Sequence, residues 1–181
     1  MRIVGGKYRH RIISFPDDMA HTRPTKDRIR EAIFSAIGDI SNARVLDLYA
    51  GSGAMGLEAL SRGASHITFV DISALAVKAV KSNLDSLKVS KEQYELIKDK
   101  DSNAIETFKN KGQQFDLVFL DPPYEQGEYE LIVKQLNDYS LLSNHAILVL
   151  EANRLVILEN IDYSKNKEYH YGDIMVFIYW R

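Results

Sequence analysis

The sequence predicts an α/β fold: a Rossmann-like, doubly wound sheet of seven mostly parallel strands. Two observations support this prediction. Between residues 44 and 151, short runs rich in Val, Ile, Leu and Phe alternate with helical apolar patterns. Near the C-terminus, two further strand-like runs meet at Gly172-Asp173, which is typical of a hairpin turn. Repeated strand–helix units require parallel strands with helices on both faces, because such crossovers are right-handed. The closing hairpin adds an antiparallel edge.

Each element follows from its apolar periodicity. Two short β-like runs around Gly5-Gly6 predict a small N-terminal β-hairpin, and a helix should follow, beginning near Thr25 and ending at Gly38. The strands of the sheet are expected at residues 44–49, 67–70, 94–97, 115–120, 146–151, 165–170 and 174–180. The helices between them are expected at residues 54–62, 74–87, 102–110 and 129–138. We expect one structural unit, in which residues 1–38 extend a domain formed by residues 39–181.

The composition limits the classes of protein to which this chain can belong. The 181 residues are 45% hydrophobic and 27% charged, which is typical of a globular domain. No apolar run is long enough to cross a bilayer, and the N-terminus lacks a signal-peptide core. The chain contains no cysteine, which excludes disulfides, thiolate metal ligands and a cysteine nucleophile. We therefore expect a cytoplasmic protein without a metal site.

The charge is unevenly distributed along the chain. Residues 1–30 contain eight Lys or Arg against three acids, a net charge of +5, whereas the remaining residues carry −7 and the whole chain −2. A basic arm on an acidic body indicates a surface that binds the phosphates of a nucleic acid. A solvated, charged hairpin is the alternative.

A glycine-rich loop follows the first strand of the sheet. Gly51, Gly53 and Gly56 have the spacing of a dinucleotide-binding fingerprint, and glycines let the backbone approach a ligand closely. Asp71, at the end of the next strand, lies where the hydroxyl groups of a ribose would be bound. These features suit NAD and other adenosine cofactors equally well.

Asp47, four residues before the first glycine, favours one cofactor. A carboxylate there would repel a diphosphate, whereas S-adenosylmethionine (SAM) has no phosphate and carries a sulfonium and an ammonium group. The alternative is that Asp47 only caps the helix or satisfies a polar group in the core.

The tetrapeptide Asp121-Pro122-Pro123-Tyr124 follows the strong strand at residues 115–120. The Asp121 carboxylate and the Pro122 carbonyl could both accept hydrogen bonds from an exocyclic amine, and Tyr124 could stack on the ring that carries it. A strand followed by Asp-Pro-Pro is also an ordinary sharp turn. Methylation at C5 of a pyrimidine generally needs a cysteine adduct, so the absence of cysteine leaves a heteroatom, and an amine, as the acceptor.

These motifs together resemble those of class I SAM-dependent methyltransferases that act on amino groups. Over nearly the whole chain, the sequence is similar to the bacterial ribosomal RNA small-subunit methyltransferase D family. The segments that carry this resemblance are residues 2–9, 22–25, 28–34, 50–64 and 171–173, together with 121–124.

The resemblance implies a reaction, a substrate and a set of roles. The reaction is transfer of one methyl group from SAM to N2 of one guanosine in 16S rRNA, within the small ribosomal subunit or its assembly intermediate, by a monomer. The residues implied to bind the cofactor are Asp47, Ala50, Gly51, Ser52, Gly53, Asp71, Ile72, Asn103, Ala104 and Asp121. The residues implied to hold the target amine are Asp121, Pro122, Pro123 and Tyr124, and those implied to contact RNA are Arg9, Arg11, Arg23, Pro24, Thr25 and Arg28.

Two other functions fit parts of the sequence. The first is an adenine-N6 methyltransferase acting on DNA or RNA, because an amine pocket of this type serves adenine equally well. The second is an NAD-binding oxidoreductase, although it leaves Asp47 and the tetrapeptide at 121–124 unexplained. Some polar residues have structural interpretations: Arg30 could pair with Glu31 or with core polar groups, and Glu58 is expected to be structural.

Overall fold

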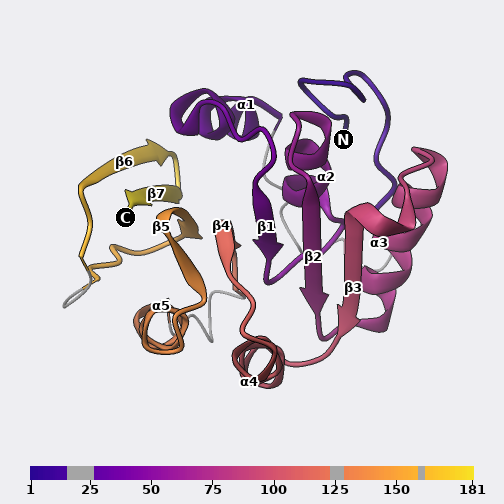
Figure 1. The fold of residues 1–181 in the computed structure, drawn as a ribbon. Helices are drawn as coiled ribbons and strands as arrows, with labels where there is room; N and C mark the ends of the chain where they lie inside the picture. The colour runs from indigo at the N-terminus through magenta and orange to yellow at the C-terminus, as the bar shows by residue number, and fades with distance from the viewer. Residues whose placement is uncertain (16–26, 123–128, 159–161) are drawn as a thin grey trace.

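The computed structural model describes residues 1–15, 27–122, 129–158 and 162–181 of the chain (Figure 1). Seven strands in these residues form one sheet in the order β3-β2-β1-β4-β5-β7-β6. The strands are β1 (Arg44–Asp47), β2 (His66–Asp71), β3 (Tyr94–Lys98), β4 (Phe115–Leu120), β5 (Leu142–Ala152), β6 (Lys165–Tyr171) and β7 (Ile174–Trp180). The helices are α1 (Asp27–Ile37), α2 (Ala54–Ser61), α3 (Ala74–Ser86), α4 (Asp101–Lys111) and α5 (Tyr129–Asp138), with a 3-10 turn, η1 (Lys91–Gln93).

The expected α/β fold is confirmed. Strands β1 to β5 pair in parallel, whereas β7 is antiparallel to both β5 and β6. The order reverses between β1 and β4, and this switch point is where open α/β sheets bind ligands at the carboxyl ends of their strands. None of the described helices is long and apolar enough to cross a membrane.

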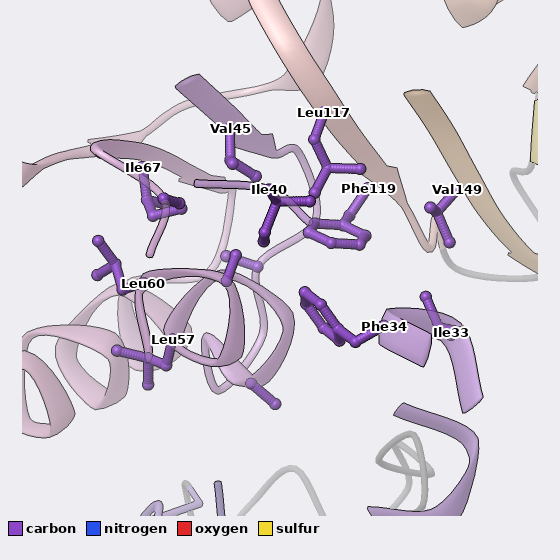
Figure 2. Close-up of a cluster of buried hydrophobic side chains, with 14 of the residues drawn as sticks. Ile33, Phe34, Ile40, Val45, Leu57, Leu60, Ile67, Leu117, Phe119 and Val149 are labelled. Carbon is purple, nitrogen blue, oxygen red and sulfur yellow. The ribbon is translucent and has the colours of Figure 1, made fainter. Parts of the chain in front are cut away.

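Helices cover both faces of the sheet, and the sheet separates the hydrophobic core into two clusters. The first core cluster joins one face to α1, α2 and α3, and the second joins the other face to α4 and α5. Figure 2 shows part of the first cluster, where Phe34 of α1 points toward Phe119 of β4, and the two ring centroids are 5.7 Å apart. This packing fixes α1 on the sheet, which explains why its apolar face contains Ile29, Ile33 and Ile37.

Two strand boundaries differ from the sequence prediction by two residues or more. Strand β5 begins at Leu142 instead of residue 146, because Phe115 pairs with Leu142 before a register shift brings Leu117 opposite Ile147. A bulge of this kind cannot be read from the alternation of one strand, because it depends on its partner. Strand β1 ends at Asp47, two residues earlier than expected, where the chain turns toward the glycine loop.

The N-terminal hairpin contains a single antiparallel bridge, between Arg2 and Ile12, instead of two paired strands. Backbone N–H groups of this segment donate hydrogen bonds to side chains of α2 instead of to a second strand. Glu58 accepts hydrogen bonds from the N–H groups of Val4 and Gly5, each at 2.8 Å. The N-terminal segment is therefore hydrogen-bonded both to α2 and within itself.

Gly6 shows how closely the hairpin lies against α2. Its φ angle is +72°, and a Cβ at this position would lie 1.8 Å from the carbonyl oxygen of Ser61. The next residue, Lys7, donates its N–H to the same carbonyl at 2.7 Å. Only glycine fits this close approach in this conformation.

The structural role expected for Glu58 is confirmed. Glu58 is fully buried and forms ion pairs with Arg30, at 3.3 Å between Oε2 and Nε, and with Arg62, at 2.8 Å between Oε1 and Nε. Arg30 is also fully buried and pairs with Asp27 at 3.0 Å. Arg30 thus pairs with core polar groups, and Glu31 is exposed.

Candidate functional site

Four carboxylates lie at the carboxyl edge of the sheet, on neighbouring strands: Asp71 ends β2, Asp47 ends β1, Asp121 follows β4, and Glu151 is near the end of β5. We refer to them as the carboxylate cluster. Strand alternation places all four on the face covered by α1, α2 and α3, because Phe69, Phe119 and Val149, each two residues before a carboxylate, belong to that core cluster.

Asp47 is the most buried member of the cluster, with 4% of its surface exposed. Its Oδ2 accepts a hydrogen bond of 3.0 Å from the N–H of Gly56, in the first turn of α2. Burial raises the pKa of Asp47 to about 7; the Gly56 N–H opposes this shift and the charge of Asp71 adds to it. Asp47 therefore makes the capping-type contact that was one alternative, and it also places a titratable carboxyl beneath the glycine loop.

The glycine loop is shaped by this contact and by Asp71. The N–H of Gly51 donates to Asp71 Oδ2, and the N–H of Ser73 donates to Asp71 Oδ1, each at 2.8 Å. Asp71 thus joins the loop after β1 to the start of α3. Each of its oxygens keeps further acceptor capacity, since a carboxylate has about four lone-pair positions.

Two glycines of the loop, Gly51 and Gly56, have different physical roles. Gly51 has a φ angle of +54°, and a Cβ at this position would meet nothing within 4 Å, so its backbone borders open space. Gly56 is packed: a Cβ there would lie 2.3 Å from the ring of Phe69. Gly51 therefore leaves room for a ligand, whereas Gly56 lets α2 approach β2. An open backbone beside acids fits SAM, which presents cationic groups and no phosphate.

Asp121 follows β4 and is exposed as a residue, whereas Pro122 is buried. Despite this solvent access, dense protein around the carboxyl raises the pKa of Asp121 well above its ordinary value, and the charges of Glu151 and Asp47 raise it further. Because of this repulsion, the protonation of Asp121 depends on the charges of Glu151 and Asp47. Pro123 and Tyr124 lie outside the described residues.

The remaining cofactor candidates lie at the same edge but differ in exposure. Ile72 is 63% exposed directly after Asp71, which is unusual for an isoleucine and leaves an apolar surface beside the loop. Asn103 is exposed in the first turn of α4, where its Nδ2 donates to Asp99 at 2.8 Å. Ala104 is buried in the second core cluster, so its side chain faces the core. Ala50, Ser52 and Gly53, which form the loop with Gly51, are buried.

The structure adds two polar residues near the site, Tyr49 and Asn83, that sequence reasoning missed. The Tyr49 hydroxyl donates to Asp101 Oδ2, which links the end of β1 to the start of α4. Asn83 of α3 is 97% buried; its Nδ2 donates to the carbonyls of Ser52, at 3.0 Å, and Ser14, at 3.1 Å. Asn83 thus connects the N-terminal arm to the glycine loop. Its only signal in the sequence is a polar residue on the apolar face of a helix.

The basic candidates of the arm lie apart from the carboxylate cluster. Lys7 and Tyr8 bind Ser61, at the C-terminal end of α2, whereas the glycine loop is at its N-terminal end. A helix of eight residues is about 12 Å long, which sets the scale of this separation. Arg9 and Arg28 are exposed, and Arg11 donates to the carbonyl of Ser86 at 3.1 Å. Arg23, Pro24 and Thr25 lie outside the described residues.

Comparison with known proteins agrees with this geometry. The family model described as "Conserved hypothetical protein 95" matches residues 1–180. The chain is 34% identical to "Putative rRNA methyltransferase YlbH" of Bacillus subtilis, over 99% of this chain and 98% of that protein. It is 36% identical to "Ribosomal RNA small subunit methyltransferase D" of Escherichia coli K12, over 84% of this chain and 74% of that protein.

The solved structure of "Putative methyltransferase yhhF" from Escherichia coli superposes with a TM-score of 0.85 at 31% identity, covering 100% of this chain and 97% of that one. A family model that spans almost the whole chain, relatives of more than 30% identity, and an open glycine loop lined by acids lead to one assignment. The chain belongs to the "Conserved hypothetical protein 95" family, shares it with relatives named ribosomal RNA small subunit methyltransferase D, and is a SAM-dependent methyltransferase.

Proposed function

We propose that this chain transfers a methyl group from SAM to the exocyclic N2 amine of one guanosine in 16S rRNA, in the cytoplasm, with the small ribosomal subunit or its assembly intermediate as substrate and the enzyme acting as a monomer. The observation that carries this proposal is Asp121, a carboxyl of raised pKa beside the glycine loop, in a chain with the rRNA methyltransferase relatives described above.

The glycine loop and its acids form the proposed cofactor site. When bound, SAM supplies an electrophilic methyl group on a sulfonium. We assign the backbone of residues 50–53 to the methionine part of the cofactor, Asp71 to the ribose hydroxyls, and Ile72 with Asn103 to the adenine. Asp47 and Asp121 contribute negative charge toward the cationic groups, which is an attraction that a diphosphate cofactor would lack. The oxidoreductase alternative has no support in this arrangement.

Asp121 and Pro122 form the proposed amine site. An exocyclic amine is a poor nucleophile because its lone pair is delocalised into the ring. Hydrogen bonds from its two N–H groups to the Asp121 carboxylate and the Pro122 carbonyl make the nitrogen more tetrahedral and direct its lone pair toward the methyl group. Most of the rate then comes from positioning and electrostatics. The methylated amine carries one extra proton, and Asp121, whose pKa is raised, is suited to accept it.

The N-terminal residues 1–38 are proposed to extend the methyltransferase domain of residues 39–181 toward the RNA. Arg9, Arg11 and Arg28 would contact phosphates at a distance from the reaction. The target base must be unstacked to reach Asp121, and Tyr124 would replace part of the lost stacking. Arg23-Pro24-Thr25 would cover the pocket.

The test is transfer of labelled methyl from SAM to small ribosomal subunits that lack the modification, with naked 16S rRNA and duplex DNA in parallel and nucleoside analysis of the product. We expect label in N2-methylguanosine from the subunits. Label in N6-methyladenosine would retain the mechanism but replace the substrate, and an absence of transfer to every acceptor would refute the proposal.

A further inference from the structure

The outermost strand of the sheet, β6, carries two lysines followed by two tyrosines at alternate positions, and the proposed function does not use them. Among the described strands, β6 has a single neighbour, β7, so its other edge is unpaired. Its residues Lys165, Lys167, Tyr169 and Tyr171 are two apart, and therefore point to the same face of the sheet. We refer to these four residues as the β6 stripe.

The register shows which face carries the stripe. Lys167 pairs with Ile178 and Tyr169 pairs with Val176, and both partners belong to the core cluster on the α1 side. Directly opposed residues of antiparallel strands point to the same face. Tyr169 and Tyr171 pack partly against this cluster, and their rings are stacked, with centroids 6.4 Å apart and planes inclined by 16°. The stripe is therefore on the face that carries Asp121.

The register also shows how the stripe reaches the carboxylate cluster. Leu120 pairs with Leu150, so Asp121 lies level with Glu151; Glu151 pairs with Val176, and Val176 pairs with Tyr169. One row thus crosses four neighbouring strands from Asp121 to Tyr169. Three strand spacings make this distance about 14 Å. Tyr171 lies two residues further toward the carboxyl edge of the parallel strands.

The charge of the stripe is positive. Lys165 and Lys167 are exposed, and the Lys165 Nζ is 4.9 Å from the centre of the Trp180 ring. In the described part of the chain, neither lysine forms an ion pair. The opposite face of β6 carries Glu168, whose Oε1 lies 2.6 Å from Nε2 of His170, so the acid of this strand points away from the stripe. The basic side of the strand is thus the side that faces the carboxylate cluster.

We infer that the β6 stripe binds single-stranded RNA that flanks the target nucleotide; this inference rests on the proposed function. Aromatic rings on the surface of a β-sheet, combined with lysines that neutralise phosphates, are a general means by which proteins hold unpaired RNA, and the rings of Tyr169 and Tyr171 are partly exposed. Tyr169 and Tyr171 stack a base next to the target, and Lys165 and Lys167 bind the phosphates that follow along the strand. The stripe and the N-terminal hairpin are two separate contacts, on opposite sides of Asp121 along the strand order.

Two double variants test the stripe, and both start from a wild type shown to methylate rRNA. Tyr169→Leu with Tyr171→Leu keeps apolar packing but removes the flat rings. We expect the Kd and the KM for unmodified small subunits to rise five- to a hundredfold, as is usual for loss of base stacking. The affinity for SAM should stay within twofold of wild type, which also reports on folding. Tyr169→Phe with Tyr171→Phe should restore RNA binding, because stacking needs the ring and not the hydroxyl.

Lys165→Gln with Lys167→Gln tests the phosphate contacts. Each phosphate contact with a single strand contributes about 0.7 to the slope of log affinity against log salt, so the slope should fall by about 1.4. The matched control is Lys91→Gln with Lys111→Gln, two exposed lysines beside β3 at the other edge of the sheet, which should leave the slope unchanged.

The outcomes separate the two proposals. If the wild type methylates 16S rRNA but both stripe variants bind RNA within twofold of it, the inference about the stripe is wrong and the proposed function stands. If the wild type neither binds nor methylates rRNA, the proposed function and the stripe are both refuted. Loss of RNA affinity in the stripe variants, with rescue by phenylalanine and no effect of the control, supports the stripe.

Discussion

Replacing Asp47 by asparagine should stabilise the protein, and increasingly so as the pH rises. The pKa of Asp47 is raised to about 7 in the folded chain, from an ordinary value of 3.8. A carboxyl whose pKa is raised by folding binds more protons in the folded state than in the unfolded state between these two values. The free energy of unfolding therefore falls as the pH increases through this window. Asparagine keeps an oxygen that can accept the Gly56 N–H, but it does not titrate.

The magnitude follows from the shift. At pH 8, where the carboxyl is ionised in both states, about three pKa units at 1.36 kcal/mol each correspond to a cost of ~4 kcal/mol to the wild type. At pH 5 the folded carboxyl is protonated and the cost is only ~2 kcal/mol. The stability advantage of Asp47→Asn should thus widen by ~2 to 3 kcal/mol between these pH values.

Urea unfolding of both proteins without SAM, at pH 5, 6, 7 and 8, measures this difference. Using differences between the two proteins cancels the titration of groups that they share. Parallel stability curves would show that Asp47 does not titrate in this window and would refute the reasoning. SAM affinity supplies a second measurement: the variant should bind SAM more weakly, because it lacks a negative charge toward the cationic groups.

Three further predictions concern the amine site, the hairpin and the core. Asp121→Ala should reduce methyl transfer below detection, because the amine loses its acceptor, while the Kd for SAM changes little; turnover near the wild-type rate would show that Asp121 does not hold the amine. Reversal of charge at Arg9 and Arg11 should weaken RNA binding and lower the salt slope by one to two units, at roughly 0.7 to 0.9 per phosphate contact; an unchanged slope would place the RNA surface elsewhere. Glu58→Gln should destabilise the fold by ~3 kcal/mol in urea unfolding, because it removes the buried carboxylate that pairs with buried Arg30 and leaves it the partly exposed Asp27; a loss below ~1 kcal/mol would show that other groups hold Arg30.

The sequence by itself determined the order of elements and the edge at which the site lies. Alternating apolar periods predict strands and helices because each depends on residues only two to four positions apart. Asp47, Asp71 and Asp121 follow strands of one parallel sheet, so their shared edge follows from connectivity alone. The open backbone at Gly51 agrees with the fingerprint spacing of the loop.

Only the tertiary structure decided how these residues are coupled. Glu151 joins Asp121 because of the register between β4 and β5, and that register includes a shift that neither strand shows by itself. Asn83 reaches Ser52, 31 residues away, because α3 packs beside the glycine loop. The face shared by Asp121 and Tyr169 likewise depends on three successive strand pairings. Contacts of this kind depend on packing between distant segments, and a one-residue change of register would turn every side chain to the other face.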